Sequence, residues 1–113
     1  MNTTARQALY LILSVLGATL TWANNLEWMK TLEVSGPAAL VQFWSEAFVT
    51  PVSSSLTWDL IILATATFIF VVVESKRLGM KYWPVIYLVL GNLIAVACIF
   101  PLFMFFRERR ISA

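Results

Sequence analysis

Two long apolar stretches joined by a short basic turn dominate this sequence. They are residues 51–74 and 82–106, and the turn between them, 75–81, contains Lys76, Arg77 and Lys81. An α-helix rises 1.5 Å per residue, so each stretch makes a helix of about 36 Å, longer than the roughly 30 Å hydrocarbon core of a bilayer. We therefore predict a transmembrane helical hairpin.

The composition also indicates a membrane protein. Hydrophobic residues make up 60% of the 113 residues and charged residues 12%, against about 25% charged in soluble domains. There is no His and one Cys, Cys98, which excludes an intramolecular disulfide, a Cys/His zinc site, a bis-His haem site and an iron–sulfur cluster on this chain alone. We expect no metal and no encoded cofactor. The net charge of +2 comes from basic helix ends and does not indicate nucleic-acid binding.

A first span is predicted over residues 5–23. A signal peptide is the alternative, but Thr21 at the first small position of Thr-Trp-Ala makes a poor cleavage site. We expect the span to be retained, with Gly17 giving a small surface for helix packing.

Residues 24–50 differ from the spans because they carry four charged residues and a Gly-Pro break, so we expect them outside the hydrocarbon. Within them, residues 38–49 have apolar side chains at helical spacing, which predicts a short amphipathic helix. This helix lies in the membrane surface or caps the bundle. The predicted fold is an all-α membrane protein in a single domain, 1–113, with three transmembrane helices, an amphipathic interfacial helix between the first and second, and a basic tail, 107–113.

The start of the second span decides the depth of Asp59. Thr50 is a good N-cap and Pro51 is favoured at the first helical position, and a start there puts Asp59 about 12 Å along the span. A start at Leu56 leaves Asp59 in the first turn, where it complements the helix dipole. In the deeper placement we expect a structural polar anchor and no catalytic residue, because Glu74, the other acid on that face, lies about 22 Å further on.

Two further polar anchors are expected. Thr67 lies on the small and polar face of the second span, and Asn92 lies near the centre of the third, where a threonine of the second span is its expected partner. Gly91 and Ala95 form a small-xxx-small packing face. Pro101 removes one backbone donor and frees a carbonyl for another contact.

The basic residues do not fix the orientation of a three-span protein. Four lie on each side of the predicted membrane, so the positive-inside rule gives no preference. The first group is Arg6, Lys76, Arg77 and Lys81, and the second is Lys30, Arg107, Arg109 and Arg110.

Three motifs carry a resemblance to a known family. They are Leu56-Thr57-Trp58-Asp59-Leu60, Val73-Glu74 with Arg77-Leu78-Gly79-Met80, and Phe100-Pro101-Leu102-Phe103 with Arg107-Glu108-Arg109. In these motifs the chain resembles the small bacterial membrane proteins of the domain of unknown function 2834 family. The resemblance covers most of the chain and implies the architecture and the positions of Asp59, Arg77, Pro101 and Arg107, but no mechanism. The Pro-Leu-Phe tail also resembles, over a short stretch, membrane-embedded carotenoid and terpenoid cyclase subunits.

Three functional hypotheses follow. We favour a non-catalytic accessory subunit of a larger bioenergetic or photosynthetic complex, in a bacterial inner or photosynthetic membrane, because a bundle of this size has little interior for a substrate pocket. Its contacts would be membrane lipids, other membrane-protein subunits, and carotenoid or chlorophyll supplied by a partner. The alternative is an isoprenoid- or carotenoid-modifying enzyme subunit in which Asp59 or Glu74 is the acid, since burial raises a carboxyl pKa. The third is an ion or proton path through Asp59, Thr67 and Asn92, which needs oligomerisation to be continuous.

Overall fold

The computed structural model describes residues 2–112. This part of the chain forms five α-helices and no strand: α1 (Thr3–Met29), α2 (Pro37–Ala47), α3 (Pro51–Leu78), α4 (Trp83–Leu93) and α5 (Val96–Ser112). The predicted all-α class is confirmed. Two of these helices, α1 and α3, are long and apolar enough to cross a membrane, whereas the sequence predicts three.

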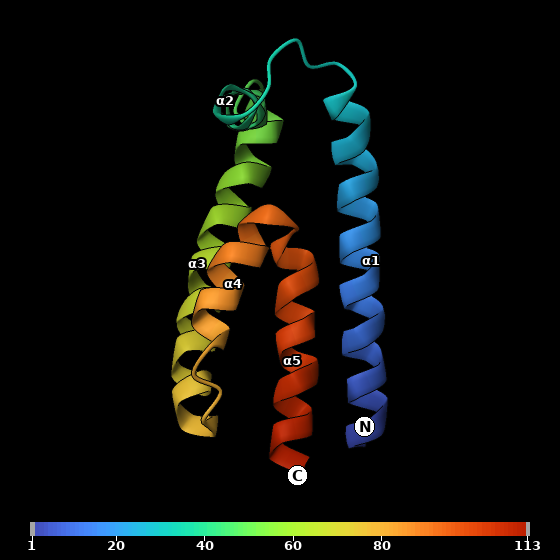
Figure 1. Cartoon of the computed structure of the whole chain (residues 1–113), viewed down its shortest axis with the longest axis vertical. Coiled ribbons are helices and arrows are strands. Elements are labelled where there is room, and N and C mark those ends of the chain that lie inside the picture. The colour runs from blue at the N-terminus through green and yellow to red at the C-terminus, as the bar shows by residue number, and fades with distance from the viewer. Residues whose placement is uncertain (1, 113) are drawn as a thin grey trace.

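The predicted third span, 82–106, is wrong because the chain turns back in its middle. α4 ends at Leu93 and α5 begins at Val96, and Figure 1 shows α5 running back beside α4 toward the end from which α4 started. The ring of Trp83, at the start of α4, lies 5.5 Å from that of Phe103 and 5.6 Å from that of Phe106, late in α5. α4 has 11 residues, about 16 Å, which is too short to cross a bilayer.

The break between α4 and α5 has a local cause and a tertiary one. Gly91 and Asn92 stand just before it, and both are poor helix formers, glycine by about 1 kcal/mol relative to alanine. The indole N–H of Trp22 in α1 then donates to the backbone carbonyl of Ile94 at 2.8 Å. A helix end leaves its last carbonyls without partners, so this bond satisfies one of them.

The two long helices lie apart. α1 packs against α5, and α3 packs against α4 and α5, but α1 and α3 do not pack against each other. In Figure 1 they form the two outer legs, the α4–α5 hairpin fills the space between them at one end, and α2 lies beside the start of α3 at the other. Both chain ends are therefore at the same end of the molecule.

α3 begins at Pro51, the earlier of the two expected positions. The Thr50 hydroxyl accepts from the backbone N–H of Ser53, and the Ser53 hydroxyl accepts from that of Thr50, both at 3.0 Å. This reciprocal capping satisfies two donors at the helix start. α3 ends before Gly79, whose φ of 71° lies in the left-handed region that glycine adopts without strain.

The buried core is small and lies where α3, α4 and α5 meet. It consists of Val71, Tyr87, Ile99 and Phe103. The hydroxyl of Tyr87 pairs with that of Thr67 and lies 3.3 Å from the carbonyl of Ala64. The core therefore joins the α4–α5 hairpin to α3, while the outer faces of the long helices do not contribute to it.

Candidate functional site

An ionic network lies at the end of the molecule that holds both termini. The Glu74 carboxylate accepts from Arg77, with Nε at 2.8 Å and Nη2 at 2.9 Å, and from Nε of Arg107 at 2.5 Å. Nη1 of Arg107 lies 3.6 Å from Glu108, which also accepts from Nη2 of Arg6 at 3.1 Å. The Glu74 and Glu108 side chains are only 10% and 7% exposed. The network thus links α3, α5 and α1 and pairs both acids.

The basic residues lie mainly at this end, so the expected equal division is wrong. Because the chain turns back after Leu93, the end of α5 returns to the turn after α3, where Nε of Arg110 donates to the carbonyl of Leu78 at 2.8 Å. Seven of the eight basic residues and two acids lie here, a net charge of +5. We call this the basic end. The seven are Arg6, Lys76, Arg77, Lys81, Arg107, Arg109 and Arg110.

The opposite end of the molecule is acidic. It carries Lys30 against Glu27, Glu33 and Glu46, a net charge of −2. Lys30 forms an exposed ion pair with Glu27 at 3.0 Å. The charge of the molecule is therefore strongly asymmetric along its length.

α1 meets α5 at a close backbone contact. A Cβ added at Gly17 would overlap the carbonyl of Ala97 and lie 2.9 Å from the amide nitrogen of Cys98, and the hydroxyl of Ser14 donates to the Cys98 carbonyl at 2.8 Å. Pro101, inside α5, has no N–H to give to Ala97 four residues earlier. The carbonyl that Pro101 frees therefore lies against Gly17, and the absence of a side chain there allows the approach.

Gly91 and Ala95 do not share a helix face. Gly91 is buried in α4, while Ala95 lies in the break after it, so the expected small-xxx-small face is interrupted. A Cβ at Gly91 would lie 3.8 Å from the side chain of Val96, which is an ordinary contact distance. The close approach of α1 to α5 thus requires a glycine at position 17, whereas α4 has room for a Cβ at position 91.

The three expected polar anchors lie in different surroundings. Thr67 pairs with Tyr87, which joins α3 to α4. The amide of Asn92 is exposed and donates to the carbonyl of Leu88 in its own helix at 2.6 Å, and not to a threonine of α3. Asp59 is exposed on α3, and within residues 2–112 its carboxylate forms no hydrogen bond or ion pair.

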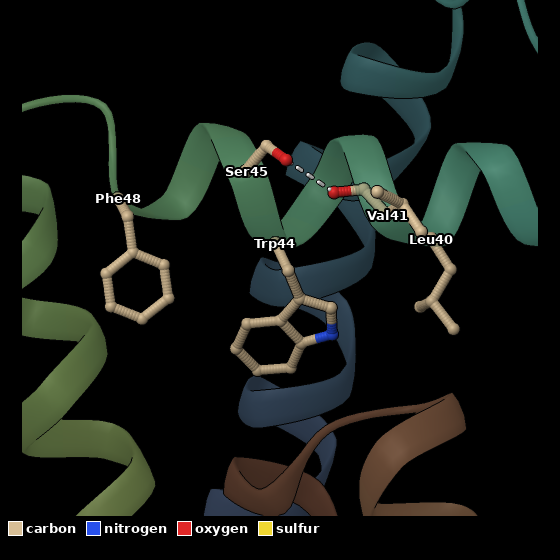
Figure 2. Close-up of a pocket in the computed structure, with 5 residues that line it drawn as sticks. All are labelled: Leu40, Val41, Trp44, Ser45 and Phe48. Atoms are coloured by element: carbon tan, nitrogen blue, oxygen red, sulfur yellow. Dashed lines mark hydrogen bonds between the residues drawn. The ribbon is translucent and has the colours of Figure 1, made fainter.

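The apolar side of α2 is open. Figure 2 shows Leu40, Trp44 and Phe48 projecting from the same side of the helix, and the Ser45 hydroxyl bonded to the Val41 carbonyl. These five residues line an open hollow of about 480 Å³. The hollow carries no charged side chain, so its chemistry suits an apolar contact.

α2 is attached to both long helices. The indole of Trp28 in α1 donates to Glu46 at 2.6 Å and its ring stacks edge-on against Phe43 at 5.3 Å. The hydroxyl of Thr57 in α3 donates to the carbonyl of Ala47 at 2.8 Å. These contacts fix α2 across the acidic end.

Four residues form hydrogen bonds or ion pairs between helices that the sequence-based prediction does not include. A buried tyrosine hydroxyl or indole N–H usually has a partner, so Tyr87 and Trp22 give a usable signal within apolar runs. The position of Glu108 between two arginines predicts that it forms an ion pair, but it does not identify Arg6 as a partner. Ser14, like Gly17, is a small residue that indicates close helix contact, but it gives no signal for its hydrogen bond to the Cys98 carbonyl.

These features define an all-α protein with two helices of membrane-spanning length and a short helical hairpin packed between them at one end. The family described as "Protein of unknown function DUF2834" matches residues 9–109, and the chain belongs to this family. The resemblance carried by the three motifs is thereby confirmed. No curated protein and no solved structure matches the chain.

Proposed function

We propose that this protein is a non-catalytic integral membrane subunit in which α1 and α3 cross the bilayer and the α4–α5 hairpin enters and leaves it from one side. The support is the outer surface of the two long helices, where large apolar side chains are exposed along most of the length. Soluble monomers rarely expose apolar patches of such extent, whereas lipid and membrane-protein partners match them. Examples are Ile12, Val15, Leu16 and Leu20 in α1 and Val52, Leu56, Ile62 and Ile69 in α3.

The charge asymmetry gives this arrangement an orientation. Cytoplasmic segments of membrane proteins carry an excess of Lys and Arg, and seven of the eight basic residues are at the basic end. The basic end is then cytoplasmic, and α2 lies on the opposite side of the membrane. The re-entrant hairpin opens toward the cytoplasm.

Asp59 is the observation that supports a partner protein. α3 has 28 residues, about 42 Å, so if it is centred on a hydrocarbon core of roughly 30 Å, Asp59 lies about 6 Å inside that core. Charged residues in spans almost always face a polar partner or water. Asp59 instead has exposed Leu56, Leu60 and Leu63 around it. A helix of a second membrane protein that carries a hydrogen-bond donor at this depth would satisfy it.

The aromatic face of α2 extends the same surface. Phe48 stacks edge-on against Trp58 at 5.6 Å, and Trp58 is the residue before Asp59. From there Trp44 and Leu40 continue along α2 (Figure 2). In our proposal the partner is a larger bioenergetic or photosynthetic complex, and its lipids, carotenoid or chlorophyll contact these aromatic rings.

Site-specific photocrosslinking in intact membranes tests the proposal. A photoreactive amino acid at Leu56 or Leu63, one turn to either side of Asp59, should crosslink to one membrane protein, at a peptide that contains a polar donor. The control position is Ile12, which is similarly exposed on α1. If Leu56 and Leu63 give only the lipid adducts that Ile12 gives, α3 faces lipid and the subunit proposal is wrong.

A further inference from the structure

A second hollow lies at the basic end, away from the proposed partner surface. It has a volume of about 520 Å³ and lies between the turn after α3, the start of α4 and the end of α5. Its walls combine two kinds of side chain. Beside Gly79, three are the cations Lys81, Arg109 and Arg110, and five are apolar or aromatic, namely Met80, Tyr82, Trp83, Ile86 and Phe106.

The three cations have no acidic partner within residues 2–112. The two acids at this end, Glu74 and Glu108, pair with Arg77, Arg107 and Arg6 instead. Among the acidic side chains of residues 2–112, none therefore balances the positive charge on this wall.

The protein nevertheless holds these cations in place. Arg110 is held by its Nε–H bond to the Leu78 carbonyl, which leaves its terminal nitrogens as donors. Lys81 lies 5.0 Å over the ring of Tyr82, and Arg109 lies 5.8 Å over that of Phe105. Contacts of this kind orient a cation without neutralising it.

We propose that this hollow binds one anionic phospholipid. Its phosphate would accept from Lys81, Arg109 and Arg110, and one acyl chain would lie along Ile86 and Phe106. Basic pockets at the cytoplasmic ends of membrane helices suit acidic headgroups, and Trp83 is of the type that lies at headgroup level. A soluble anion would use the cations but leave the apolar wall without a ligand.

This inference rests on the membrane placement proposed above but not on the partner protein. It can therefore be tested on the purified full-length chain in detergent, where a missing partner has no effect. Native mass spectrometry should show one bound phosphatidylglycerol, and a titration should show weaker binding of phosphatidylcholine with the same acyl chains. Inorganic phosphate is the third ligand tested.

The decisive variant is the double substitution Lys81→Gln with Arg109→Gln, which leaves the Arg110 bond to Leu78 intact. A cation that contacts an anionic headgroup contributes about 5-fold to its binding, so removing these two cations of the hollow should weaken phosphatidylglycerol binding about 25-fold. The matched control, Lys30→Gln with Lys76→Gln, removes the same charge from exposed positions outside the hollow and should bind nearly as the unmodified protein does. Unchanged thermal unfolding of both variants shows that the fold is intact.

Three outcomes would overturn the inference. Equal affinity for phosphatidylglycerol and phosphatidylcholine would show that the cations do not recognise the headgroup. Phosphate binding as tight as that of the lipid would indicate a soluble-anion site. An equal loss in the control variant would show that net charge, rather than this hollow, attracts the lipid.

Discussion

The indole N–H of Trp22 takes the place of a backbone amide at the carbonyl of Ile94, 2.8 Å away. In a continuous helix that carbonyl would accept from the amide of Cys98, which in the structure donates to Ala95 at 3.1 Å. The bond crosses from α1 to the point where the chain turns back. One side chain of the first helix thus stabilises the break that prevents a third span.

Trp22→Phe should lower the free energy of unfolding by about 1 kcal/mol, because the ring is kept while the Ile94 carbonyl loses its partner. Chemical or thermal unfolding in detergent, followed by circular dichroism, measures the loss. Trp44→Phe is the control, since Trp44 is exposed on α2 and should change stability little. Equal effects of the two substitutions would show that the indole bond contributes nothing.

Gly17→Ala should destabilise the α1–α5 contact by about 1–3 kcal/mol, as overpacking does elsewhere. The added Cβ meets the backbone of Ala97 and Cys98, which cannot rotate away as a side chain can. Gly91→Ala places its Cβ 3.8 Å from a valine side chain and should be tolerated. The two unfolding curves in detergent compare them directly, and greater damage from Gly91→Ala would contradict the packing described for Gly17.

The sequence predicts the fold well where local chemistry decides it. The helix start at Thr50-Pro51 follows from capping and proline preferences. The break at Gly36-Pro37 precedes the short helix expected over 38–49, which is observed at Pro37–Ala47, and an all-α chain follows from the apolar runs. The prediction of a span over residues 82–106 is wrong because hydropathy measures apolar character and not chain direction. A spanning helix and a helical hairpin that turns back have the same hydropathy. Gly91 and Asn92 weaken the helix there, but the bond that stabilises the turn comes from Trp22, 72 positions away, and no local pattern reveals this partner.

The returning hairpin changes the expected topology. Reporter fusions after Lys81 and after Ser112 should lie on the same side of the membrane, and a fusion after Lys30 on the other. The positive-inside rule makes the shared side cytoplasmic. Opposite sides for Lys81 and Ser112 would restore a third span and contradict the re-entrant hairpin.

Arg107→Gln should destabilise the protein by about 2–3 kcal/mol, since it removes a charged hydrogen bond to buried Glu74 and a contact to Glu108. Arg109→Gln removes an equal charge two residues further along α5 but breaks no ion pair within residues 2–112, so its effect should stay within about 0.5 kcal/mol. Unfolding in detergent without added lipid compares them. Similar losses would show that the network adds nothing beyond net charge.

The contacts of the site residues differ in how well the sequence predicts them. The pairing of Glu74 with Arg77 is a local helical contact, three residues apart, and is within reach of pattern reasoning. The pairing with Arg107 depends on the turn at Ile94, and so does the collection of seven basic residues at one end. The expected tie between the two sides of the membrane follows directly from the predicted third span.

The last prediction concerns Asp59 and separates the accessory-subunit proposal from the enzyme alternative. Asp59→Asn keeps the shape and the acceptor oxygen but removes the titratable proton, so assembly with a partner should be nearly normal on a native gel after mild extraction. Asp59→Leu should assemble worse, because the partner's donor loses its acceptor, a penalty of about 1–3 kcal/mol.

The matched control for Asp59 is Asn92, which is also exposed but bonds to its own helix. Asn92→Leu should assemble normally, because no hydrogen-bond donor of a partner protein loses its acceptor. If Asp59 is a catalytic acid, Asp59→Asn should lose activity while it still assembles. Acid catalysis needs the titratable proton, whereas assembly needs only the acceptor oxygen. If Asp59→Asn assembles normally but abolishes the conversion of an isoprenoid or carotenoid in membranes, Asp59 is an acid catalyst and the non-catalytic proposal fails.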